Sequence, residues 1–167
     1  MASKLPEEPS DEQAIEQRAV YLLSRREHSR AELLRKLTQK GFEANAVKRV
    51  LDTLEARNWQ SDERFSSSFI RQRVQQRHGP RKILAQLSQR GVQGEAVHME
   101  LQQQNVDWTA LAREALYRKF KQPAGRDPKE LARRHRFLAS RGFSMEHIRK
   151  AIDWLESGDF NPDDAVF

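Results

Sequence analysis

The sequence contains no cysteine. Disulfide bonds and thiolate metal sites are therefore excluded, and the composition is compatible with the reducing cytoplasm. No apolar run approaches the roughly 18–20 residues needed to span a membrane. The first ten residues also lack the apolar core of a signal peptide. We therefore expect a cytoplasmic protein that has no membrane partner.

Motifs of common catalytic and cofactor sites are also missing. The sequence has no GxxxxGK[ST], GxGxxG or GxSxG segment. Its five histidines form neither an HExxH motif nor a ligand cluster, so no metal site is expected. Several acids fall at predicted helix caps or on exposed faces, namely Glu12, Glu16, Glu32, Glu43 and Asp52. We therefore expect no catalytic residue, no cofactor and no enzymatic activity.

The main positive feature is an internal repeat. Residues 29–54 read SRAELLRKLTQKGFEANAVKRVLDTL, and residues 79–104, fifty positions later, read GPRKILAQLSQRGVQGEAVHMELQQQ. The identical pairs are Leu34/Leu84, Leu37/Leu87, Gln39/Gln89, Gly41/Gly91, Ala46/Ala96, Val47/Val97 and Leu51/Leu101. A weaker third copy follows one residue late, at Leu138, Arg141, Gly142, Phe143, Ile148 and Ile152. Self-similarity at a fixed period indicates a tandem array.

Each copy has the pattern of three short helices. In the first copy, apolar residues recur at helical spacing over 11–26, 29–41 and 43–57. Ser29 and Glu32 have the spacing of a capping box, and Gly41 can end a helix in the left-handed conformation. No stretch alternates apolar and polar residues as a strand would. We predict an all-α protein of three tandem three-helix repeats in an elongated, curved array.

The repeat phase also predicts the domain boundaries. We expect a disordered leader over 1–10, repeats over 11–59, 60–106 and 107–156, and a flexible tail over 157–167. A unit of this size buries little surface by itself, so neighbouring repeats should pack on one another. We expect the chain to be a monomer.

Charge is the second positive feature. Lysine and arginine exceed the acids by six, which indicates an anionic partner, either a nucleic acid or an acidic protein surface. No aspartate or glutamate occurs between residues 64 and 94. The candidate contact residues in this stretch are Arg71, Arg73, Arg77, Arg81, Lys82 and Arg90. Solvated lysine-rich faces usually include glutamate, so we favour a binding face over a merely solvated one.

Other features of the sequence support weaker interpretations. A second basic cluster includes Arg118, Lys119, Arg133 and Arg134. Acids interrupt it, so a binding face and a solvated face both stay open. Glutamates at the starts of the third helices would repel phosphates, which disfavours sequence-specific DNA reading by a helix-turn-helix. Trp59 and Trp108 follow the repeat, and we expect them to pack between repeats rather than stack on bases.

Four segments of the sequence have the pattern of a known family, namely LLSRREHSRAELLRKL (22–37), DERFSSSFIRQR (62–73), HGPRKILAQLSQRGV (78–92) and FLASRGF (137–143). With these segments the chain resembles the RecX family of bacterial recombination regulators over about residues 15–155. The middle of the chain is the most specific part, with an Asp-x-x-Phe helix followed by Gly-Pro-x-x-Ile and by Leu before Gly-Val. The third repeat departs furthest from the pattern.

The resemblance implies a partner and an activity. Members of this family bind the RecA filament on single-stranded DNA, limit its extension, favour disassembly and suppress its ATPase and strand exchange. They thereby regulate homologous recombination, DNA repair and the SOS response, and they can also touch single- or double-stranded DNA. Arg71, Arg73, Arg81 and Lys82 match the family's basic positions. The alternative is a helical protein that binds DNA or RNA directly, without RecA.

Overall fold

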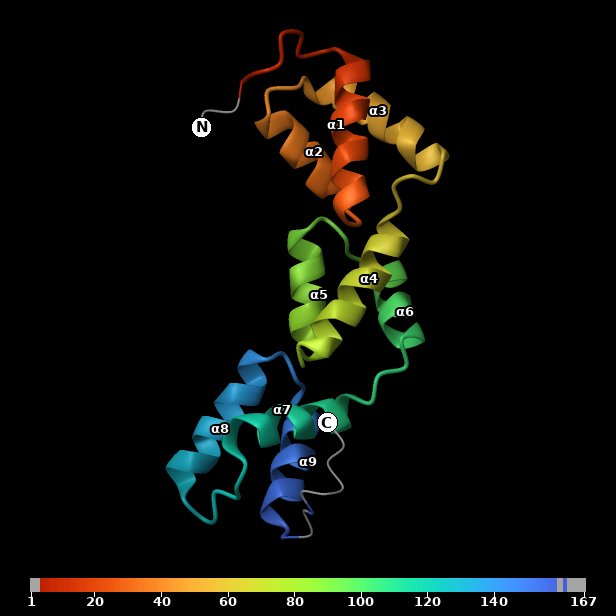
Figure 1. The fold of residues 1–167 in the computed structure, drawn as a ribbon. Helices are drawn as coiled ribbons and strands as arrows, with labels where there is room; N and C mark the ends of the chain where they lie inside the picture. The colour runs from red at the N-terminus through yellow and green to blue at the C-terminus, as the bar shows by residue number, and fades with distance from the viewer. Residues whose placement is uncertain (1–3, 159–160, 162–167) are drawn as a thin grey trace. The chain divides into compact units, whose positions relative to one another are not determined.

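The computed structural model describes residues 4–158 and 161 (Figure 1). Over these residues the chain forms nine α-helices and no strand, which confirms the predicted all-α class. The helices are α1 (Glu12–Arg25), α2 (Arg30–Gln39), α3 (Ala44–Ala56), α4 (Asp62–Gln75), α5 (Pro80–Gln89), α6 (Glu95–Gln103), α7 (Trp108–Phe120), α8 (Pro128–Ser140) and α9 (Met145–Glu156). They follow the chain as three successive groups of three.

Local side chains determine where the helices begin. Asp11 accepts hydrogen bonds from the backbone N–H groups of α1, and Ser144 does the same at the start of α9. Each cap satisfies donors that have no partner within the helix. Pro80 and Pro128 open α5 and α8, where a missing N–H costs nothing. Each of these starts depends on residues within one helical turn of it.

The chain divides into two compact units. One comprises the chain up to Phe69 together with Leu87–Glu100, and the other comprises Ile70–Gln86 together with the chain from Leu101 onward. The second repeat, α4 to α6, therefore contributes to both units. The first repeat lies wholly in the first unit and the third repeat wholly in the second.

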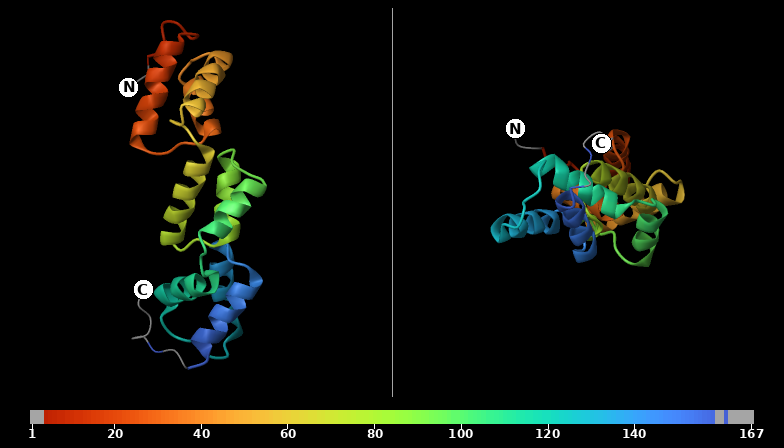
Figure 2. Two further views of the ribbon diagram at one scale, coloured as in Figure 1. Left: turned by 90° about the vertical axis from the view of Figure 1, so that its right-hand side faces the viewer. Right: turned by 90° about the horizontal axis from the view of Figure 1, so that it is seen from below.

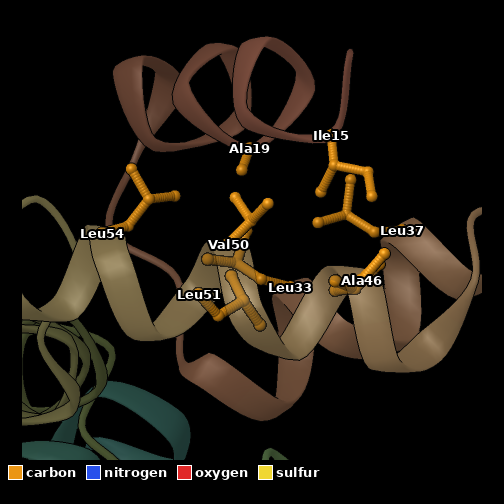
Figure 3. Close-up of a cluster of buried hydrophobic side chains, with 9 residues drawn as sticks. Ile15, Ala19, Leu33, Leu37, Ala46, Val50, Leu51 and Leu54 are labelled. Atoms are coloured by element: carbon orange, nitrogen blue, oxygen red, sulfur yellow. The ribbon is translucent and has the colours of Figure 1, made fainter. Parts of the chain in front are cut away.

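In the first unit, α3 packs against both α1 and α2 (Figures 1 and 2). Their apolar stripes meet in a closed core, shown in Figure 3. The buried side chains are Ile15, Ala19, Leu33, Leu37, Ala46, Val47, Val50, Leu51 and Leu54. Burial of these methyl-rich side chains is the main favourable term for a bundle of this size.

In the second unit, α9 packs against α7 and α8 (Figure 2). The buried side chains are Ala112, Ala115, Leu116, Leu138, Phe143, Ile148, Ala151 and Leu155. Small residues on α7 allow α9 to approach closely, and Phe143 enters this core from the turn between α8 and α9. The third repeat therefore has its own apolar core.

Part of the predicted leader has a defined position on the first repeat. The Glu43 backbone N–H donates to the carbonyl of Pro9 at 2.7 Å. A Cβ atom at Gly41 would lie 2.9 Å from the side chain of Leu5. Of the predicted tail, only Ser157, Gly158 and Asn161 fall within the described residues.

The first repeat joins the second through a glycine turn, which we call junction 1 and which lies within the first unit. The turn between α5 and α6 places Gly91 at a φ of +77°, directly against Ala31 at the start of α2. A methyl group at Gly91 would overlap the Ala31 side chain. Ser29 Oγ donates to the carbonyl of Arg90 at 2.7 Å while accepting from the Glu32 N–H. One hydroxyl thus caps α2 and binds the next repeat.

The same contact recurs at junction 2, within the second unit, where the turn between α8 and α9 meets the start of α5. The Gly79 N–H donates to the Arg141 carbonyl at 2.6 Å, and the Arg81 N–H donates to the Gly142 carbonyl at 3.0 Å. A methyl group at Gly142 would overlap Lys82, and one at Gly79 would overlap the Gly142 backbone. Glycine is therefore required on both sides of this backbone-to-backbone contact.

We predict that Gly91→Ala destabilises the protein more than Gly94→Ala. Both glycines have positive φ, so both substitutions introduce backbone strain. Only Gly91 faces another repeat, whereas a Cβ atom at Gly94 meets no atom within 4 Å. The clash should add about 1–3 kcal/mol, as overpacking does. Urea unfolding followed by circular dichroism measures the difference, and equal losses would contradict the steric role of Gly91.

Candidate partner-binding surface

Five predicted contact residues lie together in the second unit, at the end of α4 and the start of α5. They are Arg71, Arg73, Arg77, Arg81 and Lys82. The side chains of Arg71 and Arg81 are exposed, and the other three are half-buried. The tertiary structure therefore brings basic side chains from two consecutive helices to one end of the second repeat.

Arg77 is only partly available to a partner. It lies two residues after the end of α4, and its backbone is left-handed, with a φ of +60°. Its guanidinium lies 3.6 Å from Glu114 of α7, and the same carboxylate is 3.1 Å from Arg118. The negative charge of Glu114 thus partly neutralises two of the predicted contact residues, Arg77 and Arg118.

Arg90 belongs to junction 1 and not to the cluster around α4 and α5. Its guanidinium lies over the ring of Phe69, 4.7 Å from the centroid, and 3.8 Å from the carboxylate of Glu32. These contacts hold the glycine turn on α2. We therefore interpret Arg90 as a structural residue.

The second basic cluster separates into exposed and structural residues. Arg134 has a side chain only 6% exposed, which lies near Glu130 and Glu156 and over the ring of Phe120. Arg134 is among the predicted contact residues, but its guanidinium is buried and donates to the Gln122 carbonyl, so the structure gives it a role within the third repeat. Arg133 pairs with Glu130 at 3.6 Å. Lys119 is exposed at the end of α7.

The capping box predicted for Ser29 and Glu32 is only half formed, because the Glu32 carboxylate turns toward arginines instead. The Glu32 side chain is 2% exposed, and its carboxylate accepts from Arg26 at 2.7 Å while facing Arg90. The capping box is therefore formed on one side only, by the Ser29 hydroxyl. Buried carboxylates need such partners because an unpaired buried charge is costly.

The structure adds two residues that sequence reasoning did not single out as contacts. His78 is buried beside Arg73, Lys82 and Arg141. Burial is the main cause that lowers the pKa of His78, because it disfavours the charged imidazolium. Repulsion from the three nearby cations lowers the pKa further. Arg141 comes from the glycine turn of junction 2, and its guanidinium donates to the Gln76 carbonyl at 3.4 Å. Arg141 lies directly before Gly142, as Arg90 does before Gly91. This shared Arg-Gly pair was the sequence feature that could have identified Arg141.

The two other buried or half-buried histidines near helix starts behave similarly. Desolvation is the largest cause that lowers the pKa of His28 and of His147. Both ring nitrogens of His28 have neighbours, since Nδ1 lies 3.0 Å from the Arg26 carbonyl and Nε2 lies 3.2 Å from Lys36 Nζ. His28 is therefore a satisfied structural residue.

The prediction that Trp59 packs between repeats is wrong, because its side chain is 54% exposed. Trp108 is half-buried and packs against the core of the third repeat. Repeat phase alone could not distinguish these environments, since burial depends on which helix lies opposite each residue.

A groove of the second unit lies between α8 and α9 and has a volume of about 650 Å³. Leu131, Met145 and Ile152 make it mostly apolar. Its carboxylate Glu146 hydrogen-bonds Lys150, which lowers the pKa of that carboxyl. Across residues 4–158 and 161, no group of His, Asp and Glu side chains is arranged to hold a metal ion. Over the same residues, none of the helices has the length and apolar character of a membrane span.

Known proteins with the same organisation include solved structures. The chain superposes on a crystal structure described as regulatory protein RecX with a TM-score of 0.71, over 85% of this chain and 73% of that one, at 19% identity. It superposes on RecX from Lactobacillus salivarius with the same TM-score, over 88% of this chain and 97% of that one, also at 19% identity. At this identity the likeness shows the fold.

Sequence comparison is more specific. Residues 17–54, 61–98 and 106–152 match the first, second and third three-helix domains of RecX, respectively. The Regulatory protein RecX of Chromohalobacter salexigens is 44% identical over 134 residues, which are 80% of this chain and 88% of that protein. That of Pseudomonas entomophila is 40% identical over 139 residues, 83% and 90% of the two chains. The chain, with three tandem three-helix domains, therefore belongs to the RecX family of regulatory proteins.

Proposed function

We propose that this chain is a non-enzymatic negative regulator of the RecA recombinase in the cytoplasm. It binds the RecA filament on single-stranded DNA, limits filament extension, favours disassembly and suppresses ATP hydrolysis and strand exchange. The observation that carries the proposal is family membership over most of the chain, among relatives described as regulatory proteins. The resemblance of the same segments to RecX implies RecA as the target.

The basic residues of α4 and α5 support an anionic partner. Arg71 and Arg81 are exposed on the second unit, and no ion pair of residues 4–158 neutralises Arg81 or Lys82. A filament of RecA on DNA offers both acidic side chains and phosphates to such a surface. Arginine suits either partner because its planar guanidinium forms two parallel hydrogen bonds.

The mechanism requires no bond to be made or broken. A protein that binds one filament state more tightly than free RecA subunits shifts the equilibrium by the difference in binding free energy. A protein that binds a filament end changes net growth even when it is scarce relative to RecA. Uniform binding to filament and subunits would change nothing.

We predict that titrating this protein into preformed RecA filaments on single-stranded DNA inhibits ATP hydrolysis. Inhibition should be complete at a small fraction of the RecA concentration, because action at filament ends does not require coating of the DNA. A coupled ATPase assay measures this. Inhibition only at concentrations that saturate the DNA would instead support direct nucleic-acid binding without RecA.

We further predict that replacing Arg71, Arg73 and Arg81 with glutamate abolishes this inhibition, because the surface then repels an anionic partner. The matched control replaces Arg25, Arg35 and Lys48, which are exposed on the first repeat, and has the same change in net charge. Helical circular dichroism should be retained in both variants. Equal inhibition by the two variants would exclude the surface of α4 and α5 as the contact.

A further inference from the structure

Trp59 is a large apolar side chain that the first unit leaves in solvent. The residue lies in the turn between α3 and α4 and is 54% exposed. Its counterpart at the next repeat boundary, Trp108, packs against the core of the third repeat. The core of the first repeat closes without Trp59. The indole therefore adds little to the packing of the first unit, and its exposure calls for another explanation.

Hydrogen bonds fix the backbone that carries this indole. The Trp59 N–H donates to the Leu54 carbonyl at 2.9 Å, and the Trp59 carbonyl accepts from the Arg64 guanidinium at 3.1 Å. The same guanidinium donates to the side chains of Asn58 and Glu27, each at 3.0 Å. A side chain on a fixed backbone loses little conformational freedom when it binds a partner. Trp59 is therefore a preorganised contact residue.

A groove with an acidic edge begins three residues after Trp59, at the start of α4. It has a volume of about 190 Å³, and Asp62 and Glu63 line it together with the buried side chains of Val92 and Val97. These residues all belong to the first unit. Carboxylates beside aliphatic side chains suit a lysine or an arginine, which has an apolar stem and a charged head.

Glu63 is the carboxylate of this groove that a partner can reach. Asp62 already accepts hydrogen bonds from the Arg30 N–H at 2.9 Å and from the Gln60 side chain at 3.0 Å. Glu63 is exposed in the first turn of α4. A base of the partner would therefore pair with Glu63.

The charges around Trp59 favour a protein partner over a nucleic acid. Exposed acids, Glu55 and Glu63, lie four residues before and four residues after the indole. The arginines beside the turn, Arg57 and Arg64, are each in an ion pair with an acid of the first repeat. Phosphates next to a stacked base would be repelled by the acids, with little compensation from these arginines.

We propose that Trp59 and Glu63 form a surface through which the first unit binds a protein. The indole enters an apolar pocket of that protein, and the carboxylate pairs with a lysine or arginine beside the pocket. Tryptophan is enriched among the few residues that dominate the binding energy of protein interfaces. The inference rests on the proposed function, in which the partner is a RecA subunit of the filament. It adds a contact in the first unit to the basic residues of α4 and α5.

The test compares the full-length protein with its Trp59→Ala variant in the ATPase assay on RecA filaments. We expect the concentration for half-maximal inhibition to rise by about thirtyfold or more, as when an interface tryptophan is truncated. The melting temperature should be nearly unchanged, because the indole lies outside the core. The matched control is Tyr21→Ala, which removes an aromatic residue that is 51% exposed on α1. This control should inhibit nearly normally.

Glu63→Lys provides a second variant. It should weaken inhibition by about tenfold, because like charges then meet at the interface. Binding of fluorescein-labelled oligothymidylate, measured by anisotropy without RecA, should not weaken in either variant. Equal inhibition by the original protein and both variants would refute this surface alone, whereas no inhibition by the original protein would refute the proposed function and the surface with it. A parallel loss of oligothymidylate binding in Trp59→Ala would overturn the surface in favour of base stacking.

Discussion

The structure depends on one steric constraint, the absence of a side chain at the glycine of each inter-repeat turn. At Gly91 and Gly142 the next repeat approaches so closely that even a methyl group would overlap its neighbour. Both glycines also have positive φ, so glycine is needed at each position for the backbone conformation as well as for the close approach. The close approach allows the carbonyl of the preceding arginine to accept a hydrogen bond, from Ser29 at junction 1 and from the Gly79 N–H at junction 2.

Once the backbone contact is made, charge is the variable that distinguishes the two junctions. At junction 1 the buried Glu32 holds Arg26 and Arg90, and the contact is internally neutral. At junction 2 the equivalent of that acid is Lys82, and positive charge accumulates around His78. The two junctions thus share one backbone contact and differ in the charge that surrounds it.

Local features of the fold were predictable from the sequence because their causes lie within a few residues. The Asp11, Ser29 and Ser144 caps, the first-turn prolines and the left-handed Gly41 each depend on backbone groups within one helical turn. The all-α class and the three tandem repeats followed from apolar periodicity and the fifty-residue period. The RecX family was likewise recognisable from the quoted segments.

Long-range features were not predictable in the same way. Glu32 and Arg134 look like ordinary surface residues, yet both are buried because partners distant in sequence, Arg90 and Glu156, meet them there. Trp59 has the repeat phase of a packed residue but lies half exposed.

The sequence by itself determined the helices, their caps, the repeat period and the excess of positive charge, since each depends on composition or on neighbours along the chain. Only the tertiary structure decided which charges are neutralised and which converge. It places Arg90 against Glu32 of the preceding repeat at junction 1, and it places the Arg-Gly turn against Lys82 at junction 2. The physical reason is that ion pairing falls off over a few ångströms, so it depends on which segments the glycine turns bring together.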